Sequence, residues 1–552
     1  MESRVERRLS ESARHRLSRR PELALRVIPQ HPRQTPDPVE VRVKGPLLRG
    51  PVGAHLAVFD YNRDMDRMVA AADPRPDGSF PDYDIEDFRF HQLNAYAVAS
   101  RAIELVELEL GRGLGWGFEA SRLLVLPHAG YMANAFYSED THSLQFYSFQ
   151  QPDGSIYHTS LVHDIVAHET GHALLDAVRD RYTEANEPET AALHEAIGDL
   201  TAVMAALSHE VVRTDLLEQV GADLREPNRL ASIADDFGGT GPAGSLSLRD
   251  LTSSRPPSAY AGVVEPHEPS LKLTTALWQA LVGLYGANRG ADEQPDAALE
   301  LARKALQRMV VRALDYLPPA DATFADFAVA LLRADLFANP DDRRGYRALV
   351  AQALTAGGIL DDPAAVLAET APEPAWPELP SAWPRLTPTE AYVLLDNHRD
   401  QLALGRFPRY RDFVVTSFEL TSKPPDHTSL DAVILIYEYP VEVQLPQRRF
   451  GSLAGQWITI WGGGTLVFDS EGGLRHHARK PVTGPRVDRA LEFLATIVGT
   501  ALTEVHPTQD DQLRLAAARR PYLAEVGPDG LTIKANPAAR CGARSTVAEA
   551  NR

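Results

Sequence analysis

The sequence predicts an α+β fold, because helical and strand patterns occupy different stretches of the chain. Helical periodicity recurs before residue 370, for example in the apolar stripe from Phe324 to Leu332. Runs typical of β-strands dominate after residue 388. Between the two patterns, residues 370–388 hold six prolines, which stiffen the chain and exclude a helix interior.

Length and composition limit the class of protein. A chain of 552 residues is long enough for about two to four domains, and a hydrophobic content of 44% excludes a disordered or fibrous protein. The net charge of −19 argues against nucleic acids and anionic membranes as partners. The single cysteine, Cys541, excludes an internal disulfide framework and a zinc site built from several cysteines.

The N-terminal residues 1–28 are expected to form a charged arm. They are rich in arginine, but no apolar stretch follows, so they are not typical of a secretory signal. Elsewhere the longest apolar runs, such as residues 432–437, fall far short of the ~20 residues that a membrane helix needs. These features predict a cytoplasmic protein without membrane insertion, although export by a non-classical route would leave no trace.

Six parts are predicted along the chain from these changes of pattern. They are the arm, an N-terminal lobe at 29–185, a helical lobe at 186–369, the linker at 370–388, a small α+β domain at 389–530 and a tail at 531–552.

Within the two lobes, periodicity predicts particular elements. Residues 90–110 have a helical pattern, and residues 123–126 and 145–149 have strand patterns. In the helical lobe, the apolar stripe that begins at Phe324 predicts a helix with Asp321 or Thr323 as its cap.

The C-terminal domain is predicted to consist of short strands and one helix. Gly462–Gly464 predict a hairpin turn between the last two strands, and the stripe from Val487 to Leu502 predicts the helix. The expected strands are residues 413–420, 431–437, 441–445, 456–461 and 465–468.

The clearest chemical signal is the pattern His-Glu-x-x-His at residues 168–172. Apolar residues from Leu161 to Leu175 place this pattern on one face of a helix. His168 and His172 then project the same way, one turn apart, close enough to hold one zinc ion at ~2.0–2.1 Å from each nitrogen. Glu169 lies about 100° around the helix, where a general base for a zinc-activated water belongs. The alternative is a buried amphipathic helix with two incidental histidines.

A catalytic zinc needs a third protein ligand and an open fourth position. In a second helical pattern, Glu195 and Asp199 are one turn apart. Glu195 can supply the third ligand, and Asp199 can accept the remaining N–H of a ligating histidine. His194 could compete with Glu195, but it points ~100° away around the helix. The alternative is that both carboxylates are simply solvated.

These two patterns resemble the thermolysin-like gluzincin metallopeptidases, a family of zinc endopeptidases. The resemblance covers roughly residues 85–285 and is carried by Asp-Ile-Val-Ala-His-Glu at 164–169 and Glu-Ala-Ile-Gly-Asp at 195–199. It implies a two-lobed fold, with a β/α N-terminal lobe and a helical second lobe, and one catalytic zinc ion. It also implies His168, His172 and Glu195 as ligands, Glu169 as the base and Asp199 as the partner of His168.

Upstream, residues 134–137 (Asn-Ala-Phe-Tyr) are similar to the substrate-binding edge segment of this family. Asn134 and Ala135 would then bind an extended peptide through main-chain hydrogen bonds at a strand edge. The alternative is an ordinary hairpin strand.

Three further residues match family positions that act on the substrate. Arg249 resembles the arginine that binds a substrate carbonyl, and His267 resembles the histidine that stabilises the transition state. A cationic side chain aimed at the developing oxyanion supplies that stabilisation. Tyr182 is a candidate for the oxyanion tyrosine, although the loop before it is longer than in the family. Arg249 and His267 could instead be ordinary surface residues.

The chain also departs from the family. It shows no long propeptide, and the C-terminal domain has no recognised counterpart, so its partner is not predicted. Asp164 fits one calcium-ligand position, but Ala206 stands where a second carboxylate is expected. Calcium binding is therefore doubtful.

The sequence as a whole predicts a zinc metallopeptidase that acts on peptides or proteins, with an endopeptidase favoured. A gluzincin aminopeptidase would share the ligands, but it needs an acidic group for the substrate's α-amine, and we identify none. A catalytically silent, zinc-stabilised binding protein is the non-enzymatic alternative.

Overall fold

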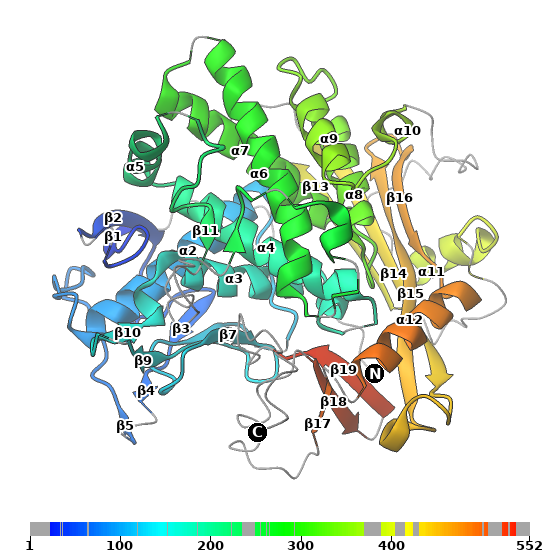
Figure 1. The fold of residues 1–552 in the computed structure, drawn as a ribbon, viewed down its shortest axis with the longest axis horizontal. Coiled ribbons are helices and arrows are strands. Elements are labelled where there is room, and N and C mark those ends of the chain that lie inside the picture. The colour runs from blue at the N-terminus through cyan, green and yellow to red at the C-terminus, as the bar shows by residue number, and fades with distance from the viewer. Residues whose placement is uncertain are drawn as a thin grey trace. The chain divides into compact units, whose positions relative to one another are not determined.

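Helices and strands both contribute to the computed structural model of the chain, so the predicted α+β class is confirmed (Figure 1). The structure describes residues 22–536 apart from gaps. The longer gaps are residues 234–248, 369–387, 405–413, 423–429 and 506–521. Shorter gaps lie at residues 34, 36, 63–65, 119, 152, 185, 222, 254, 261, 264, 292, 403, 499–501 and 528–529. Cys541 and nearly all of the predicted linker therefore lie outside the described residues.

The chain divides into two compact units. The first contains Met1–Leu105, Gly113–Ala177 and Gly198–Val212, and the second contains Val106–Arg112, Val178–Ile197 and Arg213–Arg552. Helix α4 (Pro188–Leu207) is continuous and contributes residues to both.

The first unit begins with an antiparallel pair of strands, β1 (Glu22–Val27) and β2 (Val39–Lys44). Side chains alternate along β1, and Leu25 and Val27 are buried. The expectation of a charged arm up to residue 28 is therefore wrong for residues 22–27. In the sequence, the many arginines before this strand draw attention away from a short alternation of apolar side chains, which is sufficient for a strand.

A four-stranded sheet forms the centre of the β structure in the first unit, with β7 at one edge. The predicted strand at 123–126 is confirmed as β6. The predicted strand at 145–149 is two strands, because the chain leaves this sheet after Phe146 and β9 (Ser148–Gln150) pairs with β10 (Ile156–His158) instead. The sheet order is β3 (Leu56–Val58), β6 (Leu123–Leu126), β8 (Ser143–Phe146) and β7 (Ala135–Ser138).

Two long helices begin in the first unit. The predicted helix at 90–110 is confirmed as α2 (Phe88–Leu110), and α3 (His163–Val178) carries the His-Glu-x-x-His pattern. The buried amide of Asn94 on α2 accepts from the backbone N–H of Ile28 and donates to the carbonyl of Ser160, 2.8 Å in each case. Asn94 thus connects three segments of the unit, and one of them leads directly into α3.

The second unit contains a group of helices that pack on one another. The predicted helix at Phe324 is confirmed, and its cap is Thr323, whose side chain exchanges hydrogen bonds with Asp326 in a capping box. These helices are α5 (Glu210–Val220, shared with the first unit), α6 (His267–Gly290), α7 (Pro295–Leu314), α8 (Phe324–Ala338), α9 (Tyr346–Ala356) and the short α10 (Pro363–Leu367).

The second unit also contains a seven-stranded sheet whose longest strands, β14 and β15, run side by side (Figure 1). Predicted strands 431–437 and 441–445 are one strand, β14 (Leu430–Gln444), and predicted strands 456–461 and 465–468 are one strand, β15 (Trp457–Asp469). The other members are β13 (Val414–Ser422), β16 (Leu474–Lys480), β17 (Leu502–Val505), β18 (Tyr522–Gly527) and β19 (Gly530–Ala535). All of β19 except Gly530 falls in the predicted tail.

The hairpin predicted at Gly462–Gly464 is wrong, because these glycines lie inside β15. A Cβ at Gly462 would lie 2.4 Å from the ring of Tyr439, and a Cβ at Gly464 would lie 2.5 Å from the hydroxyl of Tyr437. The glycines therefore make room for two tyrosines of the neighbouring strand. Three glycines in a row suggest a turn in a sequence, but here they mark a close approach.

The sheet that was expected to be a separate domain belongs to the second unit together with the helices. Helix α12 (Gly484–Ile497) and helix α11 (Pro388–Asn397) pack on two apolar clusters of this sheet. Thr465 donates to the carbonyl of Leu317 at 2.6 Å, and His476 Nε2 lies 2.9 Å from the carbonyl of Tyr316. These buried polar contacts attach the sheet to the segment that follows α7, a connection that strand periodicity does not reveal.

None of the helices in the described part of the chain is both long and apolar enough to cross a membrane.

Candidate metal centre

Helix α3 carries both histidines of the His-Glu-x-x-His pattern on one face. The ring centroids of His168 and His172 lie 4.6 Å apart, and the two rings are nearly perpendicular. His168 is buried. Because the two residues are four positions apart, their side chains leave the helix one turn apart and can converge on one point.

Two glycines allow α3 to approach the C-terminal half of α4 closely. A Cβ at Gly171 would lie 2.9 Å from the Cα of Gly198 and 2.8 Å from Thr201 Oγ1, and a Cβ at Gly198 would lie 2.7 Å from the ring of His168. Glycine costs about 1 kcal/mol in a helix interior relative to alanine. The close contact between the helices explains why glycine occupies both positions.

This contact brings Asp199 against His168. Asp199 is completely buried, and its Oδ1 lies 3.0 Å from Nδ1 of His168. A carboxylate at Nδ1 favours the tautomer with the proton on that nitrogen, which leaves the Nε2 lone pair available to a metal ion. Asp199 therefore lies beside the histidine with which the sequence analysis paired it.

Glu195 completes a group that could hold a metal ion. The ligand atoms of His168, His172 and Glu195 all lie within 4.8 Å of one another. Two imidazoles and one carboxylate form a donor set that suits catalytic zinc and leaves a fourth position for water or substrate. His194, the rival ligand, is not part of this group.

Glu169 is held in place by the backbone of β7. The backbone N–H of Tyr137 donates to Glu169 Oε2 at 2.9 Å, and the hydroxyl of Tyr137 donates to Asp176 Oδ2 at 2.7 Å. Burial, and then the charge of Asp176, raise the pKa of Tyr137 far above its ordinary value, so this hydroxyl keeps its proton. Two hydrogen bonds therefore connect α3 to edge strand β7.

Asn134 and Ala135 lie at the start of edge strand β7. Asn134 is buried just before the strand, and Ala135 is its first residue. Backbone groups two residues apart point to the same side of a strand. The backbone N–H and C=O of Ala135 therefore point to the same side as the N–H of Tyr137 that contacts Glu169. In the described sheet, β8 pairs with the opposite edge of β7, the edge away from Glu169.

His267 is the first residue of α6 and faces the third ligand. Its Nε2 lies 3.3 Å from Glu195 Oε2, and its Nδ1 forms a short contact with Glu265 Oε1. Burial alone would raise the pKa of Glu265, but the charge and hydrogen bond of His267 outweigh it and lower this pKa. The sequence analysis missed Glu265, although an acidic residue two positions before a candidate histidine was a usable signal.

Tyr182 and Arg249 are not brought to this group by any described contact. Tyr182 lies in a short 3-10 helix, Asp180–Thr183, where it is buried and donates from its hydroxyl to the carbonyl of Pro318 at 2.6 Å. The backbone of Arg249 lies in β12 (Arg249–Asp250), which pairs with β11 (Ser232–Ile233). The side chain of Arg249 lies outside the described part of the structure.

The close contact at Gly198 leads to a first prediction. We expect Gly198→Ala to lower stability by about 1–3 kcal/mol, because the added methyl group overlaps the ring of His168. We also expect zinc affinity to fall at least ~10-fold, because this ring is displaced from Asp199. Thermal unfolding and competition with a zinc-sensitive dye measure the two effects.

The matched control is Gly286→Ala on α6, where nothing lies within 4 Å of the added Cβ. This variant should leave zinc affinity unchanged and keep or slightly raise stability. Equal effects of the two variants on zinc affinity would contradict the proposed role of the glycine.

Comparison with known proteins finds no family model and no curated relative that matches this chain, so the argument for its function depends on the geometry of the site.

Proposed function

We propose that this chain is a zinc-dependent peptidase, distantly related to the thermolysin-like gluzincins and with their two-lobed fold. The observation that supports this most strongly is the convergence of the ligand atoms of His168, His172 and Glu195 within 4.8 Å. Glu169, next to the first ligand on the same helix, adds the base that a hydrolytic site needs. A zinc site with a purely structural role has no use for a base beside an open metal position.

Zinc held by these three residues would polarise a peptide carbonyl and acidify a water. Glu169 accepts a proton from the attacking water and later donates it to the nitrogen of the leaving amine. The hydrogen bond from the backbone N–H of Tyr137 fixes the orientation of this carboxylate at 2.9 Å. Asp199, 3.0 Å from His168 Nδ1, keeps that ligand in the tautomer that presents Nε2.

His267 is suited to stabilise the negative charge that develops on the carbonyl oxygen. Its Nδ1 contacts Glu265, so an imidazolium here would keep its Nε2 N–H, 3.3 Å from Glu195 Oε2, for the oxyanion when Glu195 binds the metal ion. Such a cation donates a hydrogen bond to an oxyanion more strongly than to a neutral carbonyl. Tyr182 has no part in this mechanism, because its hydroxyl donates to Pro318.

The substrate is a peptide or protein in an extended conformation. Edge strand β7 offers the main chain of Ala135 beside Glu169, and pairing with a strand edge uses backbone groups that all peptides share. This favours cleavage inside a chain, for which no free α-amine has to be bound. Peptides with acetylated and free N-termini should therefore be cleaved at similar rates, whereas an aminopeptidase would cleave only the free ones.

The role of His267 gives a second prediction. His267→Ala should lower kcat by about 10²–10³-fold with little change in KM, because the lost interaction forms mainly in the transition state. Steady-state kinetics on a fluorogenic peptide measure both constants. A variant that changes KM alone would show that His267 only binds substrate.

Digestion of a peptide library tests the proposed function directly. The protein should cleave peptides when loaded with zinc, lose this activity after treatment with a chelator, and regain it when zinc is added back. If zinc raises the melting temperature but no peptide in the library is cleaved at any zinc concentration, the protein is a zinc-stabilised binding protein and the proposal is wrong.

A further inference from the structure

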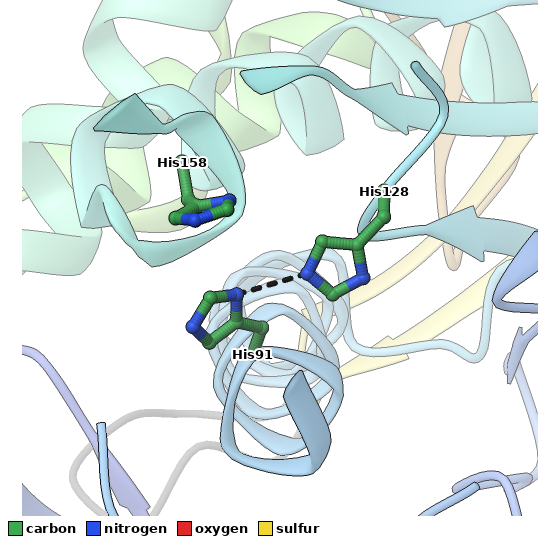
Figure 2. A group of neighbouring side chains, drawn as sticks. All are labelled: His91, His128 and His158. Atoms are coloured by element: carbon green, nitrogen blue, oxygen red, sulfur yellow. Dashed lines mark hydrogen bonds between the residues drawn. The ribbon is translucent and has the colours of Figure 1, made fainter. Parts of the chain in front are cut away.

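Three histidines outside the candidate metal centre form a second cluster in the first unit. His91 lies on α2, His128 follows β6 and His158 ends β10, and Figure 2 shows their rings turned toward one another. One ligand atom from each lies within 4.8 Å of the other two. His91 and His128 are each only 1% exposed.

The outer nitrogens of two of these rings are already occupied. Nε2 of His91 lies 2.9 Å from the carbonyl oxygen of Ile85, which can only accept, so this nitrogen carries a proton. Nδ1 of His128 lies 2.9 and 3.0 Å from the two carboxylate oxygens of Asp60 and donates to them. Gln92 also donates to Asp60, at 2.7 Å, and holds this carboxylate as an acceptor.

These outer hydrogen bonds determine whether each inner nitrogen carries a proton or a lone pair. A neutral imidazole has one N–H and one lone pair. In the neutral tautomers fixed by Ile85 and Asp60, Nδ1 of His91 and Nε2 of His128 therefore both carry lone pairs. These two atoms lie 2.9 Å apart, and two lone pairs at this distance repel each other unless a cation lies between them (Figure 2).

A proton shared between His91 and His128 could also relieve this repulsion, but it leaves Nδ1 of His158 without a hydrogen-bond partner among the described residues. The ring of Phe88, whose centroid lies 4.3 Å from that of His128, adds an apolar wall. A shared proton would also serve only two of the three rings.

The ring of His158 supplies the observation that distinguishes a bound metal ion from a shared proton. Nδ1 of His158 is buried and has no hydrogen-bond partner in the described structure. An imidazole nitrogen without a partner is costly in the interior. A divalent metal ion accepts lone pairs from all three rings at once, and the carboxylate and carbonyl on the outer nitrogens are the usual supports of metal-bound histidines.

The dimensions also suit an imidazole-bound ion. Nitrogens bound at ~2.0–2.1 Å to a tetrahedral zinc ion are about 3.3 Å apart. The observed 2.9 Å between the inner nitrogens of His91 and His128 is slightly shorter, so a small outward rotation of either ring is enough. We propose that His91, His128 and His158 bind a second divalent transition-metal ion, of the zinc class, independently of the candidate peptidase centre. The ion would connect α2, the loop after β6 and β10, and so stabilise the first unit.

Zinc titration of variants tests this second site apart from the first. The double variant His168→Ala/His172→Ala removes the peptidase centre and should still bind about one equivalent of zinc. Adding His158→Ala should remove that equivalent, whereas adding His398→Ala, which deletes a histidine of the second unit, should not. Circular dichroism of each variant establishes that it is folded.

The milder variant Asp60→Asn, made in the same double-variant background, keeps all three ligands. It should weaken zinc binding about 10–100-fold, because it removes the carboxylate that supports His128. The d–d bands of bound Co²⁺ report on its coordination geometry and do not depend on activity. The proposal is overturned if the folded double variant binds no zinc or Co²⁺, or if the His158→Ala variant keeps the full equivalent.

Discussion

Glu169→Gln is expected to lower the rate of peptide hydrolysis by about 10³–10⁵-fold while zinc stays bound. An amide cannot accept the proton of the attacking water, and the loss of a general base alone costs about 10²–10⁴. The additional loss comes from the leaving amine, which needs the same proton returned. Glutamine keeps the size of the side chain and an oxygen for the N–H of Tyr137, so the strand–helix contact at 2.9 Å should survive.

Single-turnover kinetics and metal analysis of the same preparation measure this effect. Glu218→Gln is the matched control, because Glu218 is an exposed carboxylate on α5 and should change neither quantity. If Glu169→Gln keeps more than about a tenth of the rate, another group acts as the base. If it loses zinc, Glu169 supports the metal ion instead.

Glu195→Ala should remove zinc from the peptidase centre and abolish activity. The change leaves two imidazole ligands where catalytic zinc needs three protein ligands. Glu195 supplies the third ligand atom, which lies within 4.8 Å of those of His168 and His172. Zinc affinity at this site should fall by at least ~10²-fold, since weaker supporting changes already cost 10–100-fold.

His194→Ala is the matched control for this variant. His194 adjoins Glu195 on α4 and is similarly half-buried, but it lies outside the ligand group. It should keep zinc and activity. The opposite result, with zinc lost in His194→Ala and kept in Glu195→Ala, would show that the adjacent histidine is the ligand.

The local features of the site could be predicted from sequence because helical spacing alone determines them. His168 and His172 share a face of α3, and Glu195 and Asp199 share a face of α4, as their spacing requires. The glycines at 171 and 198 acquire a meaning only in the structure, where they allow the two helices to touch.

Features that depend on distant segments could not be predicted in this way. His91, His128 and His158 are at least thirty positions apart in the sequence and have no spacing that marks a site. The glycines of β15 suggest a turn, because a sequence does not show that Tyr437 and Tyr439 lie opposite them. Short-range patterns reveal single elements, whereas sheet pairing and interior clusters follow from tertiary packing.

Anomalous diffraction at the zinc absorption edge, recorded from crystals of the zinc-loaded protein, is the most direct measurement of the central claim. The account predicts a peak bonded to one nitrogen each of His168 and His172 and to a carboxylate oxygen of Glu195, at ~2.0–2.2 Å. The absence of a peak at these three side chains, in crystals that bind zinc elsewhere, would contradict it.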